Sequence, residues 1–159
     1  MEIIDNTYPI SLKSDKNFER LKSLEFKCQR CSNCCRHQPG VVFLSEEDVK
    51  NIASFLNIDI STLLSKYCRA IYRNGEQIVA LQERKNFDCI FWNDGCIIYP
   101  ARPLQCKTYP FWPSLVESEE NWKEEKKRCP GIDTQGDLKL EEKIDFYLKE
   151  KNVKYMKII

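Results

Sequence analysis

The sequence of 159 residues lacks an excess of charge of either sign. Lysine and arginine total 25, and aspartate and glutamate total 24, which leaves a formal net charge of +1 at pH 7. Proteins that bind nucleic acids or anionic membranes usually carry a basic surplus. The balance therefore argues against a nucleic-acid partner, including a zinc-ribbon type of binding, and against an anionic membrane surface.

Long apolar runs are also missing. Charged residues interrupt every hydrophobic stretch before it reaches the roughly 18 residues that a membrane-spanning helix requires. The first segment, Met1–Tyr8, has neither the basic start nor the apolar stretch of a secretory signal peptide. We expect a cytoplasmic protein that folds as a single domain over residues 1–159.

Motifs that would indicate catalysis are scarce. The sequence has no glycine-rich nucleotide loop, no recognisable carboxylate pair and no nucleophile–histidine signature. We therefore do not favour an enzyme, and no small-molecule substrate is indicated. The alternatives to a metal-binding protein of transfer function are an enzyme that uses a metal cluster in redox or methyl-transfer-associated chemistry, and a purely structural zinc interaction module.

Cysteine, in contrast, is abundant. A reducing cytosol disfavours stable disulfides, and an odd number of cysteines with CxxC spacing favours metal binding. Cys28-x2-Cys31-x2-Cys34 places three thiols in one short segment, as in the run that opens bacterial ferredoxins. The nine cysteines are Cys28, Cys31, Cys34, Cys35, Cys68, Cys89, Cys96, Cys106 and Cys129.

The number of metal centres is open at this point. Cys35 follows Cys34 directly, and in extended backbone adjacent side chains point to opposite sides, which predicts that the two serve different centres. Cys68 ends an apolar helical stripe, so we expect a buried core thiol there. The remaining eight thiols suffice for two four-cysteine centres. One centre built from Cys28, Cys31, Cys34 and a remote thiol is the alternative.

Other residues near the thiols are less strongly indicated as parts of a metal site. His37, the single histidine, is a ligand type, but with eight cysteines available we expect a loop residue or a hydrogen-bond donor beside the centre. Pro103 predicts a short helix with Cys106 in its opening turn. Basic residues that flank the thiols would offset thiolate charge, namely Lys27, Arg30, Arg36, Arg102 and Lys107.

Hydrophobic periodicity predicts helices at 16–26, after Ser45, from Asp59 towards Cys68, and around 140–148. Residues 41–44 are expected to form a short strand, and 70–81 a β-hairpin around Asn74-Gly75. Residues 87–113 are expected to be irregular and rich in aromatic side chains, and 123–128 a solvated charged surface. Together these elements predict an α+β fold, a small cysteine-rich, metal-centred domain with peripheral helices and a β-hairpin.

Two blocks of the sequence carry a resemblance. The first is Cys28-Gln-Arg-Cys31-Ser-Asn-Cys34-Cys35-Arg36, and the second runs from Asp88-Cys89 through Gly95-Cys96 and Arg102-Pro103-Leu-Gln-Cys106 to Cys129-Pro130-Gly131. Over residues 28–131 they resemble the CxxCxxCC cysteine-cluster family, described as zinc- or iron-chelating domains. Ser32 stands where the family usually has glycine. The resemblance implies a metal site formed by Cys28, Cys31, Cys34, Cys35, Cys89, Cys96, Cys106 and Cys129.

Some longer relatives in this family are flagellin lysine methylases that carry an iron–sulfur cluster, and their cysteine region is similar to this one. Together with the ferredoxin-like spacing, this similarity favours an iron–sulfur cluster, for instance [4Fe–4S], narrowly over zinc, because four thiolates suit both. We expect a metal-binding protein whose centre either stabilises the fold or transfers electrons or metal to an unidentified protein partner.

Overall fold

The computed structural model describes residues 16–158. Met1–Tyr8, on which the prediction about a signal peptide rests, lies outside the described residues. Within them no helix combines the length and the apolar character needed to cross a membrane. The elements are α2 (Lys16–Ser23), α3 (Glu46–Leu56), α4 (Ile60–Tyr67), β1 (Cys68–Arg73), β2 (Glu76–Leu81), η1 (Tyr99–Ala101), α5 (Leu104–Thr108), α6 (Pro113–Val116), α7 (Glu119–Arg128) and α8 (Leu140–Asn152).

An antiparallel β-hairpin organises one half of the molecule. Strands β1 and β2 pair from Cys68↔Leu81 to Arg73↔Glu76. Asn74 and Gly75 form the turn with φ of 52° and 79°, as a two-residue turn between twisted strands requires. Helices α3 and α4 pack against each other beside the hairpin, and α4 runs directly into β1. The predicted hairpin and the predicted α+β fold are therefore confirmed.

Local capping sets where α3 and α4 begin. The Ser45 hydroxyl accepts a hydrogen bond from the Asp48 amide, and the Asp48 carboxylate accepts one from the Ser45 amide, which is a complete capping box. Asp59 caps α4 by accepting from the Thr62 amide. Each cap satisfies backbone donors that have no partner within the helix.

The predicted strand at 41–44 is present only as a short bridge onto β2. Phe43 pairs with Ala80, the Leu44 amide donates to the Val79 carbonyl at 3.0 Å, and the Leu81 amide donates to the Val42 carbonyl at 2.9 Å. Residues 155–157 also form isolated bridges, to Ser45 and Ile78. These short pairings attach two distant segments to the hairpin without lengthening the two-stranded sheet.

The charged run at 123–128 belongs to a helix that the sequence pattern did not reveal. Its exposed face agrees with the prediction of a solvated surface, but α7 also buries Trp122. Ser118 caps the helix by accepting from the Asn121 amide. A single apolar residue in a charged segment gives almost no periodic signal, so the helix was missed.

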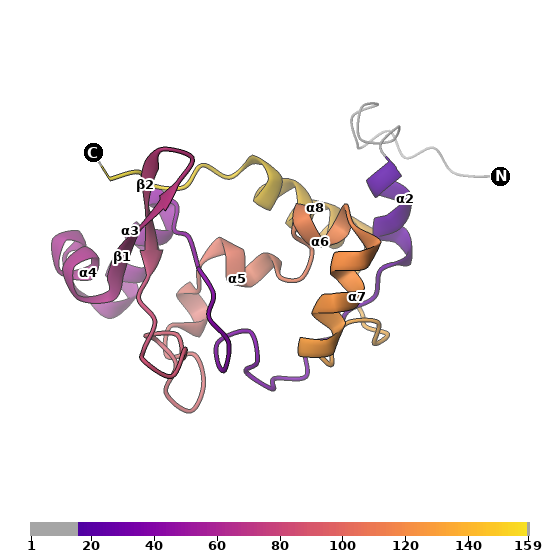
Figure 1. The fold of residues 1–159 in the computed structure, drawn as a ribbon, viewed down its shortest axis with the longest axis horizontal. Helices are drawn as coiled ribbons and strands as arrows, with labels where there is room; N and C mark the ends of the chain where they lie inside the picture. The colour runs from indigo at the N-terminus through magenta and orange to yellow at the C-terminus, as the bar shows by residue number, and fades with distance from the viewer. Residues whose placement is uncertain (1–15, 159) are drawn as a thin grey trace.

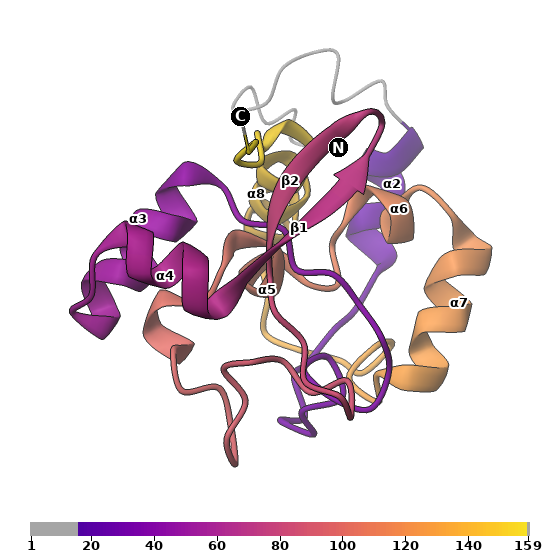
Figure 2. The same ribbon diagram turned by 60° about the vertical axis from the view of Figure 1, so that its left-hand side comes forward.

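The buried apolar side chains of residues 16–158 form two clusters. In Figure 1 the hairpin, α3 and α4 lie on the left, and α2, α6 and α7 lie on the right. Figure 2 again shows α3 and α4 on the left and α7 on the right. We call them the hairpin cluster and the α8 cluster. The hairpin cluster joins α3, α4, the hairpin and the loop around Phe91 and Ile98. The α8 cluster joins α2, α6, α7 and α8. The segment between α2 and α3, which contains Cys28–Arg36, runs from one end to the other (Figure 1).

Gly131 permits a close backbone approach at the α8 cluster. Phe26 and Ile132 form a bridge, and the Lys27 amide donates to the Gly131 carbonyl at 3.0 Å. A Cβ atom on residue 131 would clash with the carbonyl oxygen of Lys27. Gly131 therefore keeps the chain before Cys28 against the chain after Cys129.

We expect Gly131→Ala to lower the free energy of unfolding by about 1–3 kcal/mol, because backbone rather than a flexible side chain must move. Urea denaturation measures the change. Gly40→Ala is the matched control, since a Cβ there meets no atom within 4 Å. Equal effects of the two substitutions would contradict this role for Gly131.

Candidate metal centre

The front loop, which we define as residues 28–36, contains a tight turn at the adjacent cysteines. The Cys35 amide donates to the Ser32 carbonyl at 2.9 Å, and residues 33–35 are in a turn. The two sulfurs lie 3.8 Å apart. The prediction that Cys34 and Cys35 point to opposite sides was wrong, because it assumed extended backbone. At this separation the pair can bind one metal or contribute to two adjacent centres.

Two residues of the front loop have left-handed backbone. Arg30 has a φ of 54° and Ser32 a φ of 65°. Non-glycine residues adopt this region at a cost, because Cβ approaches the carbonyl oxygen. The conformation explains why glycine suits position 32, where this chain has serine.

Five thiols lie within electrostatic reach of one another around this turn. Burial raises the pKa of Cys89, Cys96 and Cys106, and the negative charge of Cys34 acts in the same direction on each. Cys35 belongs to the same group, because the Cys89 amide donates to its carbonyl at 2.7 Å. The first group of thiols is therefore Cys34, Cys35, Cys89, Cys96 and Cys106.

A second group lies at the end of α7. Cys129 is buried at the C-terminus of that helix, and the charge of Cys31 acts on its thiol. Cys28 and Cys31 are exposed in the front loop. The two groups meet at Cys34, whose thiol is influenced by Arg128 and Glu125 of α7.

Backbone amides point at several of these sulfurs with a common spacing. The Arg30 amide donates to the Cys28 sulfur at 3.4 Å. Cys89, Cys96 and Cys129 accept in the same way from the amides of Phe91, Ile98 and Gly131, each two residues further along the chain. At Cys89, Cys96 and Cys129 burial raises the pKa of the thiol, and these amide bonds act in the opposite direction, towards the thiolate that binds metal.

Cys68 differs from these four cysteines. It is buried in the hairpin cluster, as expected of a core thiol. Burial alone raises its pKa to about 11, so its environment favours the neutral thiol. His37 is exposed in the loop with a φ of 76°.

Arginines supply positive charge beside the thiols. Arg128 acts to lower the pKa of Cys34, Arg84 that of Cys89 and Arg102 that of Cys96. The prediction for Arg102 is confirmed, whereas Arg84 and Arg128 were not among the predicted residues. Arg36 contacts a carboxylate instead, at the end of the front loop.

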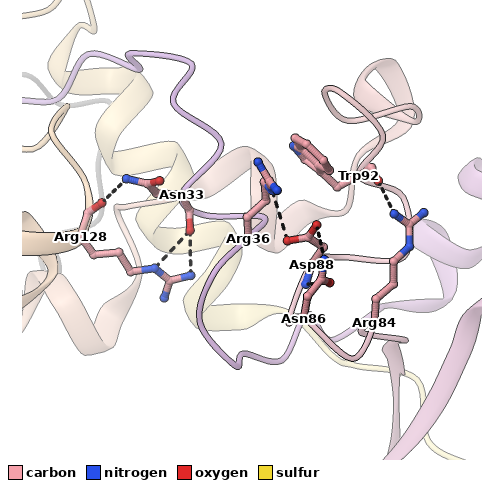
Figure 3. A network of polar contacts seen from close by, with 7 residues as sticks. All are labelled: Asn33, Arg36, Arg84, Asn86, Asp88, Trp92 and Arg128. Carbon is pink, nitrogen blue, oxygen red and sulfur yellow. Dashed lines mark hydrogen bonds and ion pairs between the residues drawn. The ribbon is translucent and has the colours of Figure 1, made fainter.

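Polar contacts hold the front loop at two points (Figure 3). Towards α7, the Asn33 side chain donates to the Arg128 carbonyl at 3.0 Å, and the Arg128 guanidinium donates twice to the Asn33 carbonyl, at 3.1 and 3.3 Å. Towards Cys89, Arg36 donates to the buried Asp88 carboxylate at 3.2 Å and stacks on the Trp92 ring at 3.7 Å. Short-range sequence patterns contain no signal for these contacts.

The donor chemistry fits a zinc or iron centre: many thiols, few competing ligand types, and compensating positive charge. Among residues 16–158, however, no three cysteine, histidine, aspartate or glutamate side chains already form a group that could hold a metal ion.

Residues 27–130 match the model of the CxxCxxCC family, which is described as "Putative zinc- or iron-chelating domain". The chain belongs to the CxxCxxCC family. The matched residues include all eight cysteines of the predicted pattern and nearly the whole segment 28–131. Metal binding by zinc or iron chelation is thereby supported for this chain. No solved structure matches the chain.

The titration of Cys34 gives a test that needs no metal. A hydrogen bond from the Cys35 thiol, with help from the Arg128 charge, lowers the pKa of Cys34 to about 7. We expect Cys34 of the metal-free protein to be alkylated by iodoacetamide with a midpoint near this pH, because the thiolate is the nucleophile. Mass spectrometry of the digested protein measures the rate at each pH.

Cys68 is the internal control for alkylation, since its thiol is buried and its pKa is about 11. A Cys34 midpoint at or above the ordinary value of about 8.5 would contradict the proposed environment.

Removing the Arg36 guanidinium tests the contact near Cys89. We expect Arg36→Ala to lower the free energy of unfolding by about 1–3 kcal/mol, because it leaves a buried carboxylate without its cation. The side chain of Asp88 is only 4% exposed. Lys149→Ala, which breaks an exposed pair with Asp145, is the control and should change little. An Arg36 variant as stable as this control would refute the assignment.

Proposed function

We propose that this protein holds two four-cysteine centres that adjoin at the Cys34–Cys35 turn. One centre takes Cys35, Cys89, Cys96 and Cys106, and the other takes Cys28, Cys31, Cys34 and Cys129. The division follows the two groups of thiols except at Cys34, whose charge acts on the first group. Cys34 is assigned to the second centre because the Cys28-x2-Cys31-x2-Cys34 spacing allows three thiols of one loop to serve one centre. Membership of a zinc- or iron-chelating family supports metal as the occupant.

The amides directed at sulfur are the observation that carries this proposal. Four cysteines from both groups accept a hydrogen bond from the amide two residues ahead, whereas Cys68 is affected by burial alone. At Cys89, Cys96 and Cys129 these amide bonds oppose the rise in pKa that burial causes, and so favour the thiolate over the neutral thiol, which is a weak acceptor. Thiolates in a partly buried site require a cation, and a metal supplies it.

We prefer iron–sulfur clusters to zinc as the occupants. The Cys28-x2-Cys31-x2-Cys34 spacing is that of a ferredoxin cluster loop. Amide hydrogen bonds to sulfur are among the features that set the reduction potential of such clusters. The exposure of Cys28, Cys31 and Cys34 leaves this side of the protein accessible, which suits electron or metal transfer to a partner protein.

The centres also have a structural role in this proposal. The hairpin cluster and the α8 cluster are separate apolar groups, and proposed ligands belong to both: Cys89 and Cys96 pack against the first, and Cys129 lies in the second. Metal bound at the two sites would link the elements around the hairpin cluster to those around the α8 cluster. Ligation then contributes to folding, on the order of 10 kcal/mol for comparable zinc sites.

Metal analysis with absorption spectroscopy on anaerobically purified protein tests the occupants. Two [4Fe–4S] clusters give about eight iron atoms per chain and broad absorbance at roughly 400 nm. A colourless protein with about two zinc ions per chain would overturn the iron–sulfur preference and keep both centres. About half of either metal content would overturn the two-centre assignment.

Single cysteine variants assign the ligands. We expect Cys129→Ser and Cys106→Ser each to lose about half of the bound metal, because each removes one ligand from a different centre. Cys68→Ala is the control and should retain the full content. Loss of all metal in both serine variants would indicate one shared centre.

A further inference from the structure

The three tryptophans differ in how their indole N–H groups are paired. Trp112 Nε1 donates to the Gln105 carbonyl at 2.9 Å, and Trp122 Nε1 donates to the Asp133 carboxylate at 3.0 Å. Trp92 Nε1 is buried and has no hydrogen-bond partner among residues 16–158. Buried donors are nearly always paired, so we expect the Trp92 indole N–H to have an acceptor.

The loop that carries Trp92 is built from the cysteines on either side of it. The Trp92 amide donates to the Cys89 carbonyl at 2.9 Å, and Trp92 forms an isolated β-bridge with Cys96. Both cysteines belong to the first group of thiols. The unpaired donor therefore belongs to the segment that supplies two proposed ligands.

The orientation of the Trp92 ring is set by its surroundings. The Arg36 guanidinium lies over the ring at 3.7 Å and is itself ion-paired with the buried Asp88 (Figure 3). Arg84 donates to the Trp92 carbonyl at 2.9 Å, which holds the backbone of the same residue. These contacts favour the observed orientation of the ring, and with it the position of the indole donor.

We propose that Trp92 Nε1–H donates a hydrogen bond to a sulfur of the centre formed by Cys35, Cys89, Cys96 and Cys106. The acceptor is a metal-bound thiolate or, in an iron–sulfur cluster, an inorganic sulfide. Such a bond stabilises negative charge on sulfur without taking a ligand position. The inference rests on the proposed function, because the acceptor exists only when metal is bound.

The first experiment follows the indole resonances of 15N-labelled protein during titration with zinc. The Trp92 indole signal is expected to shift and to exchange more slowly with solvent as zinc binds. The Trp112 and Trp122 signals, whose donors already have partners, are expected to move little. A merely structural role for Trp92 would leave its indole N–H unchanged.

The second experiment measures metal retention against a competing chelator. Trp92→Phe keeps an aromatic ring for Arg36 but removes the donor, and we expect roughly a 10- to 100-fold rise in the Kd for zinc. Trp112→Phe and Trp122→Phe are the matched controls and should show a smaller change, since their donors bond within the protein.

The outcomes separate this inference from the proposed function. Zinc binding with an unshifted Trp92 indole, or a Trp92→Phe variant that keeps the wild-type Kd, would overturn the hydrogen bond and leave the metal centres in place. A protein that takes up neither zinc nor iron would overturn both.

Discussion

The position of the front loop, and with it the arrangement of the thiols, depends on polar contacts at two anchor points. Asn33 and Arg128 bond each other through side chain and backbone, and Arg36 reaches the buried Asp88. Between these contacts the chain turns tightly enough to place two adjacent sulfurs 3.8 Å apart. The loop contributes few buried apolar side chains, so hydrophobic packing alone would not position it. Directional hydrogen bonds set the location of the thiols instead.

Charge compensation is the second requirement of the site. Several thiolates in a partly buried region repel one another, and the raised pKa values of Cys89, Cys96 and Cys106 reflect burial together with this repulsion. The arginines beside Cys34, Cys89 and Cys96 and the amides directed at sulfur act in the opposite direction. Because the two effects oppose each other, the thiols can lie close together and still lose their protons when metal binds.

Sequence reasoning succeeded where short-range chemistry decides the outcome. The Ser45 capping box, the Asp59 cap and the Asn74-Gly75 turn each involve residues within three positions of one another. Helix α7 was missed because only Trp122 marks its buried face. The Cys34–Cys35 geometry was predicted wrongly because adjacent residues were assumed to be extended. The pairing of Asn33 with Arg128 joins residues 95 positions apart, and no local pattern contains such information.

The long separation between Asn33 and Arg128 also has a consequence for biosynthesis. The ribosome releases the chain from its N-terminus at about 5–20 residues per second, so the front loop emerges roughly 5–20 s before Arg128 does. During that interval the exposed Cys28, Cys31 and Cys34 lack the segment that anchors their loop at α7. The nascent chain thus presents these thiols to oxidants and to free metal ions before the fold can select among them.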